Sequence, residues 1–284
     1  MRLIVNSILA LSFIVACKSE PTLKQEDSKI ETERLVSLSG AITETIYALG
    51  EGEKIVGRDV TSTYPEGIDA IDLGHVNQLT IEPILSTSPT IILYSQKDIN
   101  TELFQQIDKS QIRLENVEHD YSIDGAKSLI ENIAEIIDVE DYQHLIDKID
   151  SDFAKVEAFE EKPKVLFIYA RENLLLVAGK NTAMQAMIEL AGGKGAITEF
   201  EDFKPLTPEA LLQINPDVIM FFDKGFQAFG GMEALLEFPG VKQTNAGINQ
   251  RVVTMDGGLM TNFGPRTGEA ALELNQKLIE VMNK

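Results

Sequence analysis

The chain has 284 residues, one cysteine, no tryptophan and a formal net charge of −20 at pH 7. A charge of this sign argues against a nucleic-acid partner, because phosphate groups reward lysine and arginine. The single cysteine excludes a zinc site built from several thiolates.

The first seventeen residues, MRLIVNSILALSFIVAC, have the pattern of an export signal. They hold one arginine and then an apolar run that is too short to span a bilayer as a mature helix. The stretch from Ile14 to Cys17 resembles the bacterial lipobox, so we expect a diacylglycerol at Cys17; a plain cleaved signal is the alternative. Residues 18–33 are polar and acidic without apolar periodicity, which is typical of a flexible tether.

The rest of the chain repeats one plan, a strand followed by a helix. Residues 34–50, RLVSLSGAITETIYALG, begin with a strand pattern and continue with apolar residues at helical spacing up to a glycine stop. Residues 164–193 repeat this order, with KVLFIYAR as the strand and NTAMQAMIELAGG as the helix. We therefore predict an N-terminal lobe over 34–121 and a C-terminal lobe over 163–284.

One segment occurs twice, as LTIEPILSTSPTII at 79–92 and as LTPEALLQINPDVI at 206–219. In each copy a threonine can cap a helix, and a glutamate, Glu82 or Glu209, lies in the first turn, where the helix dipole favours a carboxylate. A proline then ends the helix, and a nearly continuous apolar run follows, as in buried parallel strands. The identical pairs are Leu79/Leu206, Thr80/Thr207, Glu82/Glu209, Leu85/Leu212, Pro89/Pro216 and Ile92/Ile219.

Each half is therefore predicted to be a Rossmann-like α/β unit with a mainly parallel sheet flanked by helices. Between the halves, residues 122–162 carry leucine and isoleucine at helical spacing, which predicts one long helix that joins the lobes. Two lobes joined in this way leave a crevice between the carboxyl ends of their sheets, where open α/β folds bind ligands. After the signal, no segment is long and apolar enough to cross a membrane.

The sequence lacks the motifs of common catalytic and nucleotide sites. It has no GxxxxGK loop, no GxSxG and no HExxH, and GEGEKI at 50–55 lacks the third glycine of a dinucleotide fingerprint. For an exported chain with two lobes, these absences favour a protein that carries a ligand over an enzyme.

Eight blocks between Arg34 and Ala270 resemble the periplasmic substrate-binding proteins of ABC importers, in the class with a rigid interdomain helix that serves vitamin B12, iron siderophores and haem. The blocks are RLVSLSGAITETIYALG, IVGRDVTSTYP, LGHVNQLTIEPILSTSP, VAGKNTAMQAMIELAGG, FKPLTPEALL, PGVKQTNAG, RVVTMD and FGPRTGEA. Among them, GRDVTSTYP, VAGKNTA and FGPRT are similar to the haem carriers in particular.

This resemblance implies a globular, lipid-tethered periplasmic protein that holds haem between its lobes and delivers it to a membrane permease. A siderophore or cobalamin carrier is the alternative within the class. A hydrolase-like enzyme or an adhesive surface module is the alternative outside it.

The resemblance also implies the partners. In this class a glutamate on each lobe docks against arginines of the two permease subunits, and these glutamates correspond to Glu82 and Glu209. A simple preference for helix N-termini is the alternative explanation. We expect an ABC permease dimer and its ATPase as partners, a monomeric carrier, and contact with the membrane only through the lipid.

For the haem iron, the resemblance points to residues 74–77. Haem carriers commonly have a tyrosine ligand in a GYxR stretch there, whereas this sequence has His75 and Asn77 at the tyrosine and arginine positions. Imidazole is also a competent iron ligand, and a neutral imidazole does not need the cation that arginine would supply. We therefore predict that His75 binds iron; a surface histidine is the alternative, and Tyr64 is the second candidate ligand.

The other two histidines are expected to stay away from the iron. His119 follows a strand and can reach the edge of the crevice, but a solvated loop is the expectation, and His144 is expected to face solvent from the linking helix. All three histidines precede residue 145, so the C-terminal lobe supplies no imidazole. The iron is therefore expected to be five-coordinate, or closed by water or a weak ligand.

Three arginines are candidates to pair with the haem propionates. Arg171 lies near the place where some carriers add a second histidine, and Arg58 and Arg266 are further candidates; ion pairs inside the protein are the alternative. Phe229, in the segment KGFQAFGGM, is a candidate to cover the haem ring, and core packing would explain it equally well.

Overall fold

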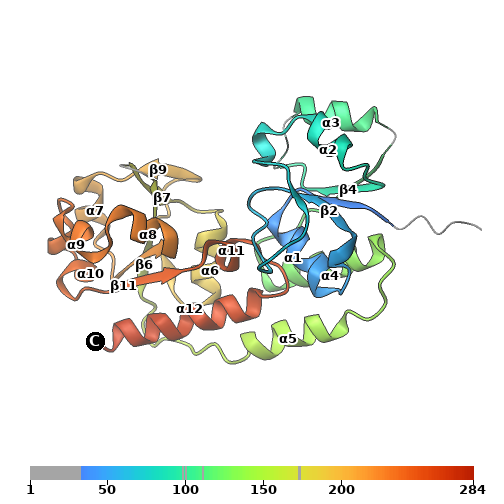
Figure 1. Cartoon of the computed structure of the whole chain (residues 1–284). Helices are drawn as coiled ribbons and strands as arrows, with labels where there is room; N and C mark the ends of the chain where they lie inside the picture. The colour runs from blue at the N-terminus through green and yellow to red at the C-terminus, as the bar shows by residue number, and fades with distance from the viewer. Residues whose placement is uncertain (1–32, 98, 100, 111, 172–173) are drawn as a thin grey trace, which may run out of the picture. The chain divides into compact units, whose positions relative to one another are not determined.

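The computed structural model describes residues 33–284 except 98, 100, 111, 172 and 173, and of Arg171 it describes the backbone alone. The predicted signal, the lipid attachment at Cys17 and nearly all of the tether lie outside the described residues. The described chain forms two lobes, each built around a β-sheet (Figure 1). No helix in this part of the chain has both the length and the apolar character needed to cross a membrane.

The N-terminal lobe has a fully parallel sheet in the order β3-β2-β1-β4-β5. This confirms the predicted parallel sheet for the first half. Its strands are β1 (Leu35–Ser37), β2 (Ile55–Arg58), β3 (Ile71–Asp72), β4 (Ile91–Tyr94) and β5 (Arg113–Asn116). Its helices are α1 (Gly40–Ala48), α2 (Ile81–Ser86) and α3 (Thr101–Asp108), with short 3₁₀ turns η1 (Gly52–Lys54) and η2 (Val76–Gln78).

The C-terminal lobe has a mixed sheet in the order β11-β10-β6-β7-β9, with β8 beside β6. The strands β11, β10, β6 and β8 run parallel, whereas β7 pairs antiparallel with both β6 and β9. The expectation of a mainly parallel sheet therefore holds for only part of this lobe. The reason is local: β7 follows β6 after a very short connection, and a short connection joins antiparallel strands.

The strands of this sheet are β6 (Lys164–Arg171), β7 (Leu174–Ala178), β8 (Lys194–Gly195), β9 (Phe203–Pro205), β10 (Val218–Phe222) and β11 (Val252–Met255). The helices of the lobe are α6 (Ala183–Leu190), α7 (Pro208–Ile214), α8 (Asp223–Phe229), α9 (Gly231–Glu237), η3 (Val241–Gln243), α10 (Asn245–Ile248), α11 (Gly257–Thr261) and α12 (Thr267–Met282).

The segment that joins the lobes is two helices, α4 (Ile123–Ile136) and α5 (Gln143–Phe153), and not the single long helix that the sequence predicted. The chain leaves the helical conformation after Ile136, and Asp138 adopts a left-handed conformation with φ of 58°. Such a residue cannot continue an α-helix, so the helix breaks there. The apolar face of α4 packs into the core of the N-terminal lobe, together with Ile146 and Ile149 of α5.

Both lobes are packed on both faces of their sheets. In β4, Ile91 and Leu93 join one apolar cluster while Ile92 and Tyr94 join another. In β10, Val218 and Met220 join one cluster while Ile219 and Phe221 join a second. Because successive side chains of a strand point to opposite faces, each strand is buried on both sides, and its sequence is therefore apolar throughout, as predicted.

The duplicated segment forms the same structure twice, α2 followed by β4 and α7 followed by β10. The residue before each proline, Ser88 or Asn215, is left-handed with φ of 48° or 42°, so the chain turns at the equivalent position after both helices. The copies differ at their first residue. Thr207 caps α7 by accepting the backbone N–H of Ala210, whereas the side chain of Thr80 makes no such bond.

The helix α12 ties the linking segment to the C-terminal lobe. Its inner face lies in the core of that lobe, and its first turn meets α5 so closely that a Cβ on Gly268 would lie 2.4 Å from the carbonyl oxygen of Ile149. Further along, the fully buried side chain of Asn275 bonds both the N–H and the carbonyl of Glu157 and the carbonyl of Ala191.

Candidate functional site

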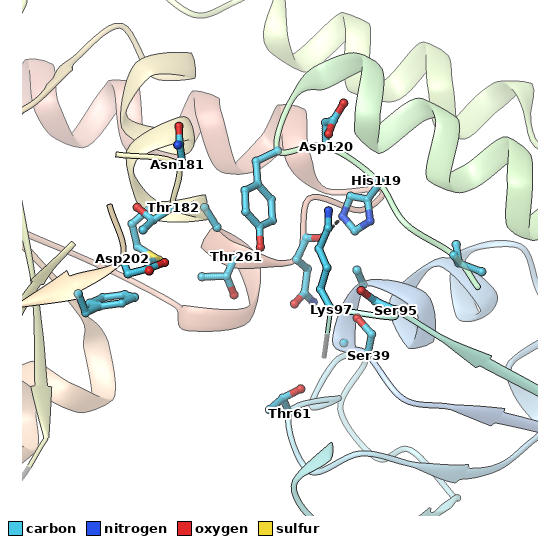
Figure 2. A pocket seen from close by; sticks show the side chains of 18 residues that line it. Ser39, Thr61, Ser95, Lys97, His119, Asp120, Asn181, Thr182, Asp202 and Thr261 are labelled. Carbon is cyan, nitrogen blue, oxygen red and sulfur yellow. Dashed lines mark hydrogen bonds between the residues drawn. The ribbon is translucent and has the colours of Figure 1, made fainter. Parts of the chain in front are cut away.

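Residues of both lobes line a pocket of about 700 Å³ (Figure 2). Parallel strands end at the same edge of a sheet, and the N-terminal lobe contributes the residues that follow its strands there: Ser39 after β1, Thr61 after β2, Ser95 after β4 and Val117 after β5. The C-terminal lobe contributes the start of α6, β9 and the end of α11. On the N-terminal lobe, the pocket therefore lies at the carboxyl ends of the strands, as predicted. On the C-terminal lobe, helix ends and β9 form the wall, and not the carboxyl ends of parallel strands.

Several hydroxyl groups lie in the walls of this pocket, and a buried network holds part of them in place. The carboxylate of Asp59, which is almost fully buried, accepts bonds from the N–H and hydroxyl of Thr61 and from the hydroxyl of Ser62. Thr43 links Ser62 to Ser37 at 2.8 and 2.7 Å. The loop after β2, which carries Thr61, is thus fixed from inside the lobe.

His119 is the histidine that the structure places in the wall of this pocket (Figure 2). Its Nε2 lies 3.1 Å from the carbonyl oxygen of Asn262, and its ring meets Tyr121 edge to face. Tyr121 in turn packs on Phe263 with the ring centres 5.1 Å apart. The expectation of a solvated loop for His119 was wrong, because these contacts with the C-terminal lobe hold the residue half-buried at the pocket.

A second pocket of about 410 Å³ is lined by Thr63 of the N-terminal lobe and by residues of the C-terminal lobe, mostly apolar atoms. Tyr169, near the end of β6, is one of them, and its ring packs on Phe222 and Phe203 at 6.1 and 6.2 Å. The sequence reasoning did not single out this tyrosine. Its place near the carboxyl end of a predicted parallel strand was the available signal.

His75 lies exposed on the loop before η2, after Gly74, whose φ of 94° requires glycine. Neither His75 nor Asn77 is among the residues that line the two pockets. His144, on α5, is exposed and lies 3.5 Å from Asp141, as expected of a residue that faces solvent.

Two of the arginines predicted to bind propionates, Arg58 and Arg266, have acidic or carbonyl partners within the protein. Arg58 pairs with Asp72 at 3.5 Å and donates to the carbonyl of Asp59, while its buried Nε has no partner in the described chain. Arg266 donates two bonds to Glu44. Propionates would have to compete with these contacts. Arg171 pairs through its backbone with Leu174 at the end of β6.

The other predicted residues fall into three places. Phe229 stacks on Phe221 with ring centres 6.4 Å apart and packs against the core of the C-terminal lobe. Tyr64 is 44% exposed, and its ring lies 3.4 Å from the guanidinium carbon of Arg266. Glu82 and Glu209 are exposed in the first turns of α2 and α7.

The hydroxyl of Thr80 and the backbone N–H of Glu82 donate to the Glu82 carboxylate and lower its pKa, so this carboxylate stays charged below the usual range of a glutamate. Within the described residues there is no group of three or more His, Cys, Asp or Glu side chains that could hold a metal ion. The pocket walls include side chains that can ligate haem iron, among them those of His119, Tyr121, Met184 and Tyr169.

Comparison with known proteins agrees with this architecture. The structure is similar to the apo form of the periplasmic haem-binding protein RhuT from Roseiflexus sp. RS-1, with a TM-score of 0.83, 33% identity, and coverage of 88% of this chain and 99% of that one. It is similar at the same TM-score and coverage to the periplasmic haem-binding protein BhuT in complex with two haems, at 32% identity.

In sequence, the chain is 28% identical over 273 residues to the uncharacterized ABC transporter substrate-binding lipoprotein YvrC of Bacillus subtilis (strain 168). The alignment covers 93% of this chain and 83% of the relative. The family model described as periplasmic binding protein matches residues 35–259. The chain therefore belongs to the periplasmic binding protein family, whose members bind a substrate for transport and are not enzymes.

Proposed function

We propose that the protein is the substrate-binding component of an ABC importer and that it captures haem between its lobes. The observation that carries this proposal is the pocket of about 700 Å³ lined by both lobes, in a fold that matches two haem-binding proteins over 99% of their length. Pockets for drug-sized ligands have volumes of about 300–1,000 Å³. Imidazole and phenol groups in the walls provide the ligand chemistry that haem iron needs.

His75 is the proposed axial ligand, because it stands in the GHVN stretch at the place of the tyrosine of the haem carriers. Other residues compete with it. His119, Tyr121 and Tyr169 line the pockets, and Tyr64 remains the second candidate from the sequence, whereas His75 is exposed on the loop before η2. Ligation by His75 requires the loop before η2 to turn toward the ligand. Ligation by His119 through Nε2 would break its contact with the carbonyl oxygen of Asn262, 3.1 Å away.

A haemin titration followed in the Soret region tests both parts of the proposal. The wild-type protein should give a Soret band that saturates at a fixed stoichiometry, and His75→Ala should weaken binding and shift the band. His144→Ala is the matched control, because His144 is exposed on α5 and lines neither pocket. If His119→Ala or Tyr169→Phe abolishes the native spectrum while His75→Ala keeps it, the iron ligand is that residue instead.

A ferric siderophore or a cobalamin is the second candidate ligand. The hydroxyl groups of Ser39, Thr61, Ser95 and Thr261 in the larger pocket favour an oxygen-rich molecule over a bare porphyrin face. Calorimetric titration with ferric siderophores and cobalamin, in parallel with haemin, distinguishes these ligands. The absence of a saturable Soret band together with tight binding of one of the others would replace haem in the proposal.

Glu82 and Glu209 are proposed to dock the protein on the permease, one carboxylate for each permease subunit. Their support is that both are exposed and begin equivalent helices of the duplicated segment. Replacing both by Ala should reduce ligand-stimulated ATPase activity of the reconstituted importer and leave ligand affinity unchanged. The pair Glu102→Ala and Glu233→Ala is the control, because these glutamates are also exposed in the first turns of helices, one in each lobe.

Export and lipid anchoring are proposed from the sequence of residues 1–17, and the relative YvrC is named a lipoprotein. We expect a monomer in the periplasm, held to the membrane through a diacylglycerol on Cys17. Cys17→Ser should move the protein from the membrane fraction to the soluble fraction without changing ligand affinity. Unchanged partition into membranes would reject the anchor.

A further inference from the structure

Among the described residues, a buried carboxylate of the N-terminal lobe has all of its hydrogen-bond partners in the C-terminal lobe. Glu44, in the middle of α1, has a side chain that is 3% exposed. One oxygen accepts Nε of Arg266 at 2.9 Å, and the other accepts Nη2 of Arg266 at 2.7 Å and the amide of Asn262 at 3.1 Å. A buried carboxylate is costly unless it is paired in this way, so the lobes must stay close for Glu44 to remain satisfied.

The guanidinium of Arg266 makes a second contact with the N-terminal lobe. It lies over the ring of Tyr64, with its central carbon 3.4 Å from the ring centre. Tyr64 belongs to the loop after β2, which also supplies Thr61 and Thr63 to the walls of the two pockets. A cation stacked on an aromatic ring and paired with a carboxylate has a fixed orientation, because both contacts depend on the plane of the guanidinium.

Asn262 extends the same set of contacts to the larger pocket. Its side chain donates to Glu44, its backbone carbonyl lies 3.1 Å from Nε2 of His119, and the residue itself lines the pocket. The approach is close, since a Cβ added to Gly40 at the start of α1 would lie 2.9 Å from Oδ1 of Asn262. The C-terminal segment 262–266 therefore contacts three parts of the N-terminal lobe that form or adjoin the pocket wall.

We propose that Glu44, Asn262 and Arg266, with Tyr64, act as an inter-lobe pin that sets the width of the ligand pocket. These are positioning residues: they hold the pocket walls at one separation before the ligand arrives. The need for such a pin follows from the linking segment, which is broken between α4 and α5 and is not one continuous helix. The inference does not depend on which ligand the pocket holds.

Loss of the pin should let the unliganded protein sample several lobe separations. Only the fraction with the native separation would bind ligand, and the apparent affinity falls in proportion to that fraction. If about a tenth of the molecules keep the native separation, the affinity for haemin falls about tenfold. The loss should appear mainly as slower ligand association, because only that fraction of the unliganded molecules is competent to bind.

Pulsed electron–electron double resonance on the ligand-free protein measures the lobe separation as the distance between two spin labels, one on each lobe. Spin labels placed by Ser86→Cys and Gln213→Cys, in a chain carrying Cys17→Ser, sit at exposed equivalent positions on α2 and α7. We expect one narrow distance distribution for this labelled chain and a clearly broader one after Glu44→Gln or Arg266→Gln. Arg251→Gln is the matched control: this arginine also donates two bonds from its guanidinium, but both go to carbonyls of its own lobe.

Circular dichroism and urea unfolding identify the variants that fold. If Glu44→Gln does not fold, Asn262→Ala removes a single bond from the same carboxylate and should broaden the distribution to a smaller extent. A distribution as narrow as that of Arg251→Gln, in folded Glu44→Gln, Arg266→Gln or Asn262→Ala, overturns the pin. A broadened distribution supports it even if haemin does not bind, so this result and the haemin titration can fail independently.

Discussion

Asn275 is predicted to be one of the most sensitive polar positions of the protein. Its side chain is fully buried in α12 and makes three hydrogen bonds: Nδ2 donates to the carbonyls of Glu157 and Ala191 at 2.8 and 3.0 Å, and Oδ1 accepts the N–H of Glu157 at 3.0 Å. These bonds attach the segment after α5 to the C-terminal lobe. Asn275→Ala removes all three and leaves their backbone partners behind.

The magnitude follows from the number of bonds and the burial of the partners. Hydrogen bonds contribute about 0.5–1.5 kcal/mol each, so three give roughly 1.5–4.5 kcal/mol. The groups of Glu157 lie near the surface, where water can replace the lost bonds, whereas the carbonyl of Ala191 is buried and keeps its full desolvation penalty of about 1–3 kcal/mol. We therefore expect a loss of about 2–4 kcal/mol in the free energy of unfolding, out of a total of about 5–15 kcal/mol for a folded domain.

Equilibrium urea unfolding measures this loss as a lower midpoint at unchanged slope. Asn249→Ala is the control, because Asn249 is exposed and makes a single bond within its own helix region; its effect should stay within about 0.5 kcal/mol. Equal midpoints for the two variants would refute the reasoning, since they would mean that buried bonds of Asn275 contribute no more than an exposed one.

Three further outcomes follow from the structure. Gly247→Ala should lower the free energy of unfolding in urea by about 1–3 kcal/mol or more, because its Cβ would lie 1.9 Å from the carbonyl oxygen of Val241. Gly257→Ala is the control and should cost far less, because the atom nearest to its Cβ would be 3.7 Å away. Thr207→Ala should destabilise the protein by about 1 kcal/mol through loss of its helix cap, and Thr80→Ala by less, because Thr80 makes no capping bond; thermal unfolding compares the two. Because the Thr80 hydroxyl is the main cause of the lowered pKa of Glu82, Thr80→Val should raise that pKa toward its ordinary value in an NMR titration of the carboxyl carbon. The stability linked to Glu82 is present above the ordinary pKa of a glutamate and is lost as the pH falls through the lowered value, so Thr80→Val should reduce this pH-dependent contribution.

Local sequence patterns were sufficient to predict the duplication and the central strands β1, β4, β6 and β10. The apolar run of β4 and the matching run of β10 follow from burial on both faces, and the helix ahead of each follows from the threonine and glutamate that begin it. The break between α4 and α5 was missed, because DVEDY at 138–142 has no proline or glycine and apolar residues continue on both sides. Only the backbone conformation of Asp138 reveals it.

Contacts between distant residues could not be predicted from those patterns. Glu44 looks like an ordinary polar position of a short helix, and Arg266, its partner, is 222 residues away in the chain. Without that partner in view, Arg266 remained a candidate for a propionate. The placement of His119 has the same origin, since it depends on Asn262, 143 residues further along.

The edge strand β9 of the C-terminal sheet also affects how the protein behaves at high concentration. β9 is short, has exposed residues along its whole length, and pairs with β7 on one side only among the described residues. The N–H of Leu206 points toward β7, so the nitrogen of Pro205, one residue earlier, faces the open side, where it has no hydrogen to offer a new strand. Lys204 adds a charge to the same edge. This edge is thus closed to sheet-to-sheet aggregation, and the protein can reach high local concentrations without forming fibres through it.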